Sequence, residues 1–402
     1  MSYAAALTAT VVGTLIGTLL VALAALAGAR TGRPAMVMLR GLFGARLSYL
    51  PTVLNVLQLL GWATFELFVI SSALSQLLPW HARWPYIVLA GALTTVMAIW
   101  PLGAVRMLRR FALVAVLASM TYLFVRLGMH PVASLTAGSW SGFWSSGDYV
   151  VAVAVSWIPL AADYSRHSRS ESAAFGGALV GYTVTQVACY ALGLLAFATV
   201  VPATVDSGAL QHDLFAAFIG VPVGWFAFGI LIARELDESF ANVYSTVMSV
   251  QNLRPLADRR VMALLVGTVT TALALALNID AYQNFLLLLG STFVPMFAVF
   301  MVRYFVARGY RSWDTSQTAP PRWSMLVPWL LGFVAYQIVN PGSLSWWVSV
   351  WSRPRGWLHV SSQPWLSASV ISFAVAFVVA LALVGAGRPS TARLPSTVED
   401  AA

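Results

Sequence analysis

The chain has 402 residues, of which 59% are hydrophobic and only 9% are charged, and its formal net charge is +9. This composition is far too apolar for a soluble globular domain, so the soluble classes of protein are excluded. The single cysteine, Cys189, excludes an internal disulfide.

Apolar runs long enough to cross a bilayer, about 20 residues each, recur along the whole chain. Backbone polar groups in lipid must be satisfied internally, and runs this long that do not alternate with polar residues indicate helices. The sequence therefore predicts an all-α polytopic membrane protein with eleven transmembrane helices. We expect them at residues 5–29, 50–76, 84–104, 110–128, 148–163, 173–201, 217–249, 261–279, 282–306, 324–340 and 365–387.

The arginines predict the orientation, because the chain contains 23 arginines and no lysine. Alternation of the eleven spans places 18 arginines in one set of loops and only Arg83, Arg126, Arg353 and Arg355 in the other. Cytoplasmic loops carry the positive excess, so we expect an external N-terminus and a cytoplasmic C-terminus in the cell membrane. The same rule accounts for the net charge, so we expect no nucleic-acid partner.

No soluble domain is visible, and we expect one membrane domain over residues 1–402 with a disordered cytoplasmic tail at 388–402. Pairs of glycines four residues apart, Gly13 with Gly17 and Gly177 with Gly181, predict tight helix packing. The chain lacks metalloprotease, phosphate-loop and nucleophile-elbow motifs, and its five histidines fall in loops or at helix ends. We therefore expect no enzyme, no metal site and no cofactor.

The span at 50–76 contains the first polar intrusion, in "LLGWATFELFV" with Trp62, Phe65 and Glu66. Trp62 and Glu66 are four residues apart and share a helix face. An aromatic plate beside a carboxylate suits a flat heterocycle that stacks on the ring and hydrogen-bonds at its edge. The alternative is that Trp62 is only a core aromatic.

The span at 148–163 contains the second intrusion, in "AVSWIPLAADYSRHSR". Ser156 and Trp157 precede Pro159, which interrupts helical hydrogen bonding and leaves backbone groups free. Asp163 and Arg166 then end the helix at the cytoplasmic side.

The span at 217–249 carries four charges, in "IARELDESFANVYS". At about 100° per residue, one stripe contains Glu235, Glu238, Asn242 and Ser245. Because a carboxylate at membrane depth is costly, it normally faces a bundle interior or a wet pathway. The alternative is an internal ion pair that only fixes packing, since Arg234 can reach the residues three and four positions later.

Several segments, taken in order, resemble helices of the nucleobase:cation symporter family, which includes cytosine permeases and allantoin and benzylhydantoin transporters. The resemblance rests on "SYLPTVLNVLQLLGW", "SWIPLAADYSRHSR", "ANVYSTVMSVQNL", "YQNFLLLLGSTFVPMFAVFMVRYFV" and "PWLLGFVAYQ". The form "DESFANVYS" is most similar to the purine-cytosine permease and hydroxymethylpyrimidine transporter branch.

This resemblance implies a leucine-transporter-type fold of two inverted five-helix repeats plus two further helices. The first predicted span then corresponds to the family's second helix, so we expect the family's first helix to be absent from this sequence. Residues 5–128 become the remainder of the first repeat, 148–306 the second repeat, and 324–387 the two further helices.

The resemblance also implies roles for single residues. Trp62 falls on a stacking aromatic, Asn242 on a substrate-binding asparagine, and Trp157 near a second stacking aromatic. Glu66 falls where relatives often have glutamine; an ionised carboxylate only accepts hydrogen bonds, which favours an N–H-rich edge such as that of an aminopyrimidine or aminopurine.

The resemblance also concerns the coupling ion. Ala233, Leu236 and Asp237 fall where sodium-binding relatives have cation ligands, but Asp237 replaces a hydroxyl and Leu236 supplies no side-chain oxygen. The choice between H+ and Na+ therefore stays open.

We expect a permease that imports a nucleobase-like heterocycle, such as cytosine, a purine or hydroxymethylpyrimidine, coupled to a cation. Its partners are this small-molecule substrate and the lipid bilayer; no oligomeric state is predicted. The alternative is a non-transporting receptor or sensor that retains the pocket. The expected substrate site comprises Trp62, Phe65, Glu66, Ser156, Trp157, Glu238 and Asn242, and the expected coupling residues are Ala233 and Asp237.

Overall fold

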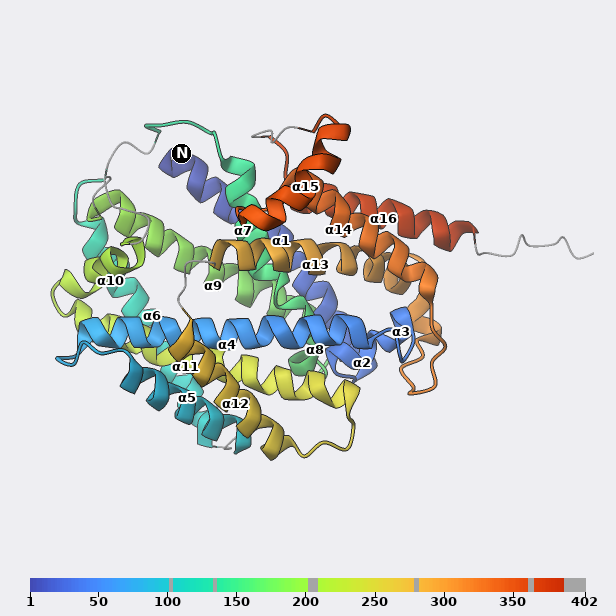
Figure 1. Cartoon of the computed structure of the whole chain (residues 1–402). Helices are drawn as coiled ribbons and strands as arrows, with labels where there is room; N and C mark the ends of the chain where they lie inside the picture. Colours follow the sequence, from blue (N-terminus) through green and yellow to red (C-terminus); the bar gives the residue numbers. More distant parts are fainter. Residues whose placement is uncertain (101–103, 133–135, 202–208, 278–281, 361–364, 387–402) are drawn as a thin grey trace, which may run out of the picture.

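The computed structural model describes residues 1–100, 104–132, 136–201, 209–277, 282–360 and 365–386, which form helices and turns without a strand. The helices on which the predicted spans mainly lie are labelled in Figure 1. They are α1 (Tyr3–Thr31), α4 (Tyr49–Leu77), α5 (Trp84–Ile99), α6 (Ala104–Gly128), α7 (Phe143–Val155), α8 (Ile158–Ser165), α9 (Glu171–Thr199), α11 (Gly224–Leu253), α12 (Arg259–Ala276), α13 (Tyr282–Met301), α14 (Leu326–Val339) and α16 (Ala368–Ala386).

Each of the eleven predicted spans is helical over most of its described residues, and apart from the span at 217–249 the boundaries differ by a few residues. Among the described residues, seven helical segments are long and apolar enough to cross a membrane, and three apolar helices are shorter. α11 is not among them because its sequence carries four charges in five residues. Residues 101–103, 278–279 and 387 of the predicted spans, and the predicted tail at 388–402, lie outside the described residues.

The predicted start of the span at 217–249 is wrong. Residues 217–220 end a separate helix, α10 (Leu210–Gly220), and a turn with Val223 in the left-handed region (φ 57°) precedes α11. Apolar composition continues across this turn, so hydropathy alone did not reveal it. Short helices also form within predicted loops: α2 (Ala35–Met38), α3 (Arg40–Phe43) and α15 (Ser345–Trp357).

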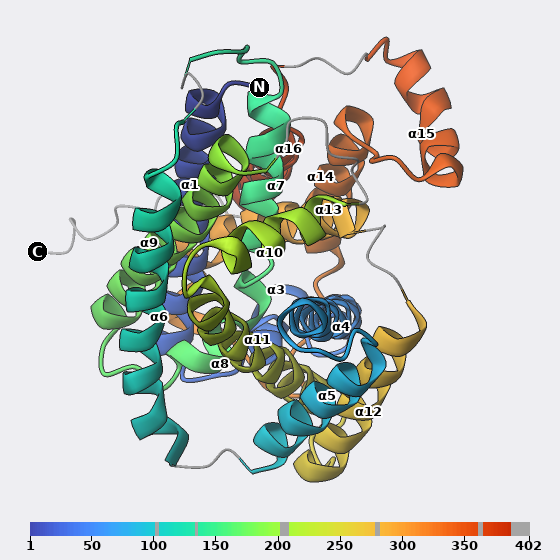
Figure 2. The same cartoon turned by 90° about the vertical axis from the view of Figure 1, so that its left-hand side faces the viewer.

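The helices pack in two main groups. α1 packs along α7, α8 and α9, whereas α4 packs along α5, α11 and α12. α13 packs against α7, α14 and α16. Figure 2 shows α1, α7 and α9 on one side, α4, α5 and α12 on the other, and α11 between them.

The two glycine pairs behave differently. A Cβ at Gly13 would lie 3.0 Å from Val150 Cβ, and one at Gly17 would lie 2.5 Å from Ala154 Cβ, which confirms tight packing of α1 on α7. The same prediction for α9 is wrong, because a Cβ at Gly177 or Gly181 would meet nothing within 4 Å. Two glycines four residues apart allow close packing, but the spacing alone does not reveal whether a neighbouring helix lies close to them.

Loops expected on the same side of the membrane meet at the same end of the bundle. Arg30 pairs with Glu171 at 2.5 Å, and buried Arg40 donates to Asn252 Oδ1 at 2.7 Å. At the other end, the Ser2 amide donates to the Ser139 carbonyl at 2.9 Å. The pairing of loops thus agrees with the alternation of the predicted spans.

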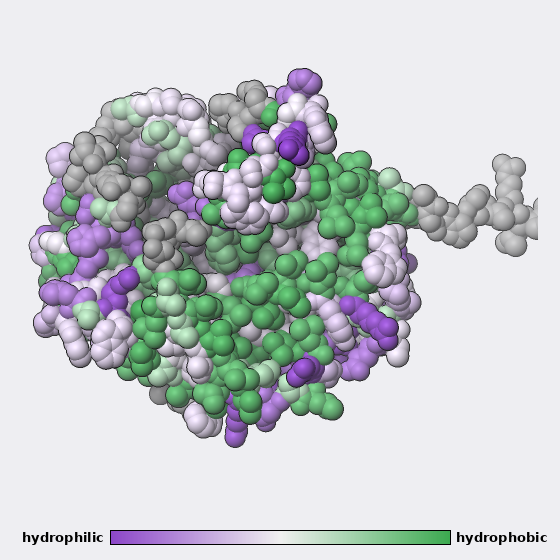
Figure 3. Space-filling model, in the orientation of Figure 1, coloured by the Kyte–Doolittle hydropathy of each residue, from purple (hydrophilic) through white to green (hydrophobic). Residues whose placement is uncertain are grey.

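The outer surface is largely apolar. Figure 3 shows hydrophobic residues over much of the middle of one face, with polar residues mostly toward its margins. On α12, for example, Val261, Leu264, Leu265 and Val269 are exposed. Extended apolar surface of this kind is typical of a protein in contact with lipid.

Asp148, only 2% exposed, joins α7 to the start of α16. Its carboxylate accepts from Ser367 Oγ at 2.5 Å and from the amides of Ala368 and Ser369 at 2.8 and 3.2 Å. Helix-start amides have no partner within their own helix. This buried carboxylate therefore fixes α16 to the bundle.

Replacing Asp148 with alanine is expected to lower the free energy of unfolding by roughly 3 kcal/mol, because buried donors lose their acceptor. The measurement is thermal unfolding in detergent. Asp258→Ala is the matched control: Asp258 accepts from Arg260 and Val261 amides at the start of α12, but it is exposed. Those hydrogen bonds, chiefly from Val261, lower the pKa of Asp258, yet water can replace them. Equal losses for the two variants would contradict the buried-cap role.

Candidate functional site

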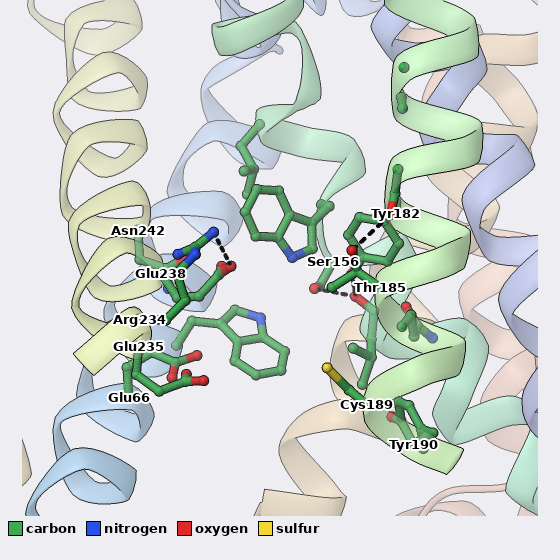
Figure 4. Close-up of a pocket in the computed structure, with 18 residues that line it drawn as sticks. Glu66, Ser156, Tyr182, Thr185, Cys189, Tyr190, Arg234, Glu235, Glu238 and Asn242 are labelled. Atoms are coloured by element: carbon green, nitrogen blue, oxygen red, sulfur yellow. Dashed lines mark hydrogen bonds and ion pairs between the residues drawn. The ribbon is translucent and has the colours of Figure 1, made fainter. Parts of the chain in front are cut away.

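A cavity of about 550 Å³ lies between α4, the junction of α7 and α8, α9 and α11. Figure 4 shows Glu66, Glu235 and Glu238 facing Tyr182, Thr185 and Cys189 across it. Its lining residues are Trp62, Glu66, Val153, Ser156, Trp157, Leu160, Gly177, Ala178, Gly181, Tyr182, Thr185, Gln186, Cys189, Tyr190, Arg234, Glu235, Glu238 and Asn242.

The junction of α7 and α8 forms one wall. The helix is interrupted at Ser156 and Trp157, immediately before Pro159, which confirms the predicted break. Ser156 Oγ donates to the Val153 carbonyl at 2.7 Å, and the Ser156 carbonyl accepts from Gln58 Nε2 at 3.1 Å. The break therefore exposes a serine and a tryptophan to the cavity while α4 satisfies the freed carbonyl.

The α4 wall carries the predicted aromatic and acid. Trp62 and Glu66 both line the cavity. Trp62 packs edge-on against Phe65, Tyr282 and Phe285, with ring centroids 5.6–6.0 Å apart. Phe65 does not line the cavity; it stacks on Tyr282 at 4.3 Å and supports Trp62 from behind.

The α11 wall presents the stripe expected from the sequence. Glu235, Glu238 and Asn242 line the cavity, whereas Ser245 is fully buried further along the helix. The Glu235 carboxyl lies beside that of Glu66 from α4 (Figure 4). Two carboxyl groups from different helices thus meet at this wall.

Arg234 is the one basic residue among the described lining residues. Its guanidinium lies 3.3 Å from Asp237 and 3.7 Å from Glu238. The predicted intrahelical pairing is therefore present, and it includes a cavity residue. Asp237 and the exposed Ala233, both expected as coupling residues, do not line the cavity.

The α9 wall was missed by the sequence analysis. Tyr182, Thr185, Gln186, Cys189 and Tyr190 line the cavity from this helix. Trp157 packs edge-on against Tyr182, with centroids 6.0 Å apart. The available signal was the spacing of three, four and seven residues between Tyr182, Thr185, Gln186 and Cys189, which places small polar groups on one helix face.

The cavity also depends on Gly177 and Gly181, whose missing side chains leave it open. Gly181→Leu is expected to abolish ligand binding and uptake by filling this space, without loss of stability, because leucine favours helix over glycine. Gly193→Leu is the control: it is on the same helix, also has open space around it, and does not line the cavity. Binding assays and thermal unfolding of both variants test this. Normal uptake by Gly181→Leu would show that this cavity is not the transport site.

Among the described residues, no group of three or more His, Cys, Asp or Glu side chains could hold a metal ion.

The fold is of the leucine-transporter type. Two structures of the nucleobase-cation-symport transporter Mhp1 are similar to it: a closed conformation with bromovinylhydantoin bound (TM-score 0.70, 18% identity, 97% of this chain and 87% of that one) and an inward-facing conformation (TM-score 0.70, 16% identity, 96% and 83%). A substrate-bound, outward-open Na+-coupled sialic acid symporter is also similar (TM-score 0.64, 14% identity, 97% and 88%). At these identities the likeness establishes the fold.

The family model described as "Permease for cytosine/purines, uracil, thiamine, allantoin" matches residues 1–322. The chain belongs to this permease family. No curated protein matches the sequence. The resemblance found from the sequence motifs is thus confirmed at the level of family and fold.

Proposed function

We propose that this permease imports a nucleobase-like heterocycle, such as cytosine, a purine or hydroxymethylpyrimidine, and couples it to H+ or Na+. The observation that carries the proposal is the convergence of Trp62, Glu66, Glu238 and Asn242 with the helix break at Ser156 in one cavity. The flat indole suits stacking, and the carboxylates suit the N–H edge of a ring. Breaks in membrane helices are where transporters of this architecture bind substrates.

The proposed substrate site comprises the cavity residues Trp62, Glu66, Ser156, Trp157, Glu238 and Asn242, with Phe65 as a support for the first tryptophan. For coupling we propose Asp237, with Ala233 as its neighbour one turn earlier. Asp237 does not line the cavity but pairs with Arg234, whose guanidinium also lies near the cavity residue Glu238, so the coupling charge is next to the site without contacting the substrate. No cofactor other than the coupling ion is proposed.

The experiment is uptake of labelled cytosine, adenine and hydroxymethylpyrimidine by cells that lack their own nucleobase permeases and express this chain. Saturable uptake of at least one of them, removed by Gly181→Leu but not by Gly193→Leu, supports the proposal. If cells that express the protein at a normal level on their surface take up no more label than cells that lack it, the proposal is wrong.

We further propose that the protein lies in the cell membrane with its N-terminus outside and its C-terminus in the cytoplasm, following the arginine distribution. Reporter fusions at Gly138 and Asp258 are expected to report external and cytoplasmic locations, respectively. A cytoplasmic signal from Gly138 with an external one from Asp258 would invert the orientation; the same side for both would contradict the span assignment.

A further inference from the structure

The charges of the cavity do not balance. Three carboxyl groups, those of Glu66, Glu235 and Glu238, line it, against the single guanidinium of Arg234. That guanidinium is already within 4 Å of two acids, at 3.3 Å from Asp237 and 3.7 Å from Glu238. The neighbouring carboxyls of Glu66 and Glu235 therefore have no basic side chain among the lining residues to offset them.

Three hydroxyls of the opposite walls can act only as acceptors toward a ligand. The hydroxyls of Ser156, Tyr182 and Thr185 each donate to a backbone carbonyl, at 2.7, 3.4 and 2.9 Å. A hydroxyl that has donated its only proton can offer a ligand nothing but lone pairs. Three of the hydroxyls that line the cavity are in this state.

Gln186 gives the second, independent sign. Gln186 is only 6% exposed, and its Nε2 donates to the Val150 carbonyl at 3.1 Å. Its Oε1 is buried and has no hydrogen-bond partner in the structure. A buried amide oxygen without a donor is costly, and an N–H group of a ligand in the cavity that Gln186 lines would offset this cost.

We propose that the cavity takes its substrate as a cation, a positively charged amino-heterocycle with N–H donors toward both walls. This rests on the proposed function, because it specifies the substrate class of the same cavity. Carboxylates held away from water are stabilised by an opposite charge, and a ring cation offers both that charge and the donors. Trp62 and Trp157, which also line the cavity, add a second attraction, since the face of an indole attracts cations.

Two matched pairs of probes test this by titration calorimetry on the purified full chain in detergent. Benzamidine and benzamide have nearly the same shape but differ in charge. 2,4-Diaminopyrimidine carries amino donors at the two ring positions where uracil carries carbonyl acceptors. We expect benzamidine and 2,4-diaminopyrimidine to bind at least about tenfold more tightly than their partners. Glu66→Gln and Glu235→Gln are each expected to reduce this ratio, while Asp213→Asn, in α10 and not among the lining residues, leaves it unchanged.

The opposite ranking, with benzamide and uracil bound as tightly as or more tightly than the cations, would overturn the proposal. It would mean that protons, rather than a ligand, neutralise the acids. Uptake of cytosine or uracil by the same protein would then leave the proposed transport function intact. If none of the four probes binds and no labelled heterocycle is taken up, the proposed transport function and the proposed cationic substrate are both wrong. If a heterocycle is taken up but the cationic probes are not preferred, only the proposed cationic substrate is wrong.

Discussion

Trp62→Ala is expected to weaken the binding of a heterocyclic substrate about tenfold to hundredfold. Stacking of a flat ring on an aromatic side chain contributes roughly 1–3 kcal/mol, and Trp62 is the aromatic of α4 that lines the cavity beside Glu66. The measurement is equilibrium binding on purified protein. Trp62→Phe, which keeps an aromatic plate, should recover most of the affinity.

The alternative for Trp62 is a core role, since its ring contacts Phe65, Tyr282 and Phe285. Phe65→Leu separates the two roles, because Phe65 belongs to the same aromatic cluster but does not line the cavity. We expect this variant to lose thermal stability and keep most of its affinity. If Trp62→Ala loses stability while its affinity stays normal, Trp62 is a core aromatic only.

Glu238→Gln and Asp237→Asn are expected to separate substrate binding from coupling. Removal of the Glu238 charge leaves Arg234 paired with Asp237 at 3.3 Å, so the protein should stay inserted and folded. An amide in place of this cavity carboxylate loses a charged hydrogen bond of about 1.5–3 kcal/mol. Affinity should therefore fall about tenfold or more, or shift to other ring edges.

Asp237→Asn should keep the affinity, because Asp237 does not line the cavity. It should fail to concentrate substrate against a gradient, since an amide neither titrates nor pairs ionically with Arg234. The cost in stability should be only roughly 1 kcal/mol, because the Arg234 side chain is 41% exposed and keeps Glu238 at 3.7 Å. Binding, counterflow exchange and driven accumulation should be measured on each variant. Normal accumulation by Asp237→Asn would exclude the coupling role, and a protein too unstable to purify would indicate a structural ion pair.

Much of the architecture could be predicted because hydrocarbon imposes simple requirements on sequence. Apolar runs revealed the membrane helices, and Pro159 revealed the break between α7 and α8. The turn at Val223 before α11 was not predicted, since apolar residues continue through it and no charge marks it. Membrane hydropathy reports burial in lipid and is insensitive to local turns.

The candidate site could be predicted only in part, for a related reason. Charged residues such as Glu66 and Glu238 are conspicuous in an apolar segment, so the α4 and α11 walls could be predicted, as could the junction wall from Pro159. The α9 wall consists of glycines, tyrosines and small polar residues, which are common on any membrane helix. Nothing in the nearby sequence marks Asp148, at the edge of a span, as buried, because its partners near residue 368 are distant in sequence.

Driven uptake into proteoliposomes tests the transport function most directly. Purified protein, reconstituted into sealed vesicles with an imposed pH or Na+ gradient, is given labelled cytosine, adenine or hydroxymethylpyrimidine, and the internal label is followed over time. We expect one of these to accumulate above its external concentration, to leak back when an ionophore collapses the gradient, and to be excluded by Gly181→Leu. Saturable binding to the same preparation without any entry of label into the vesicles would contradict transport and indicate a receptor or sensor that uses the same cavity.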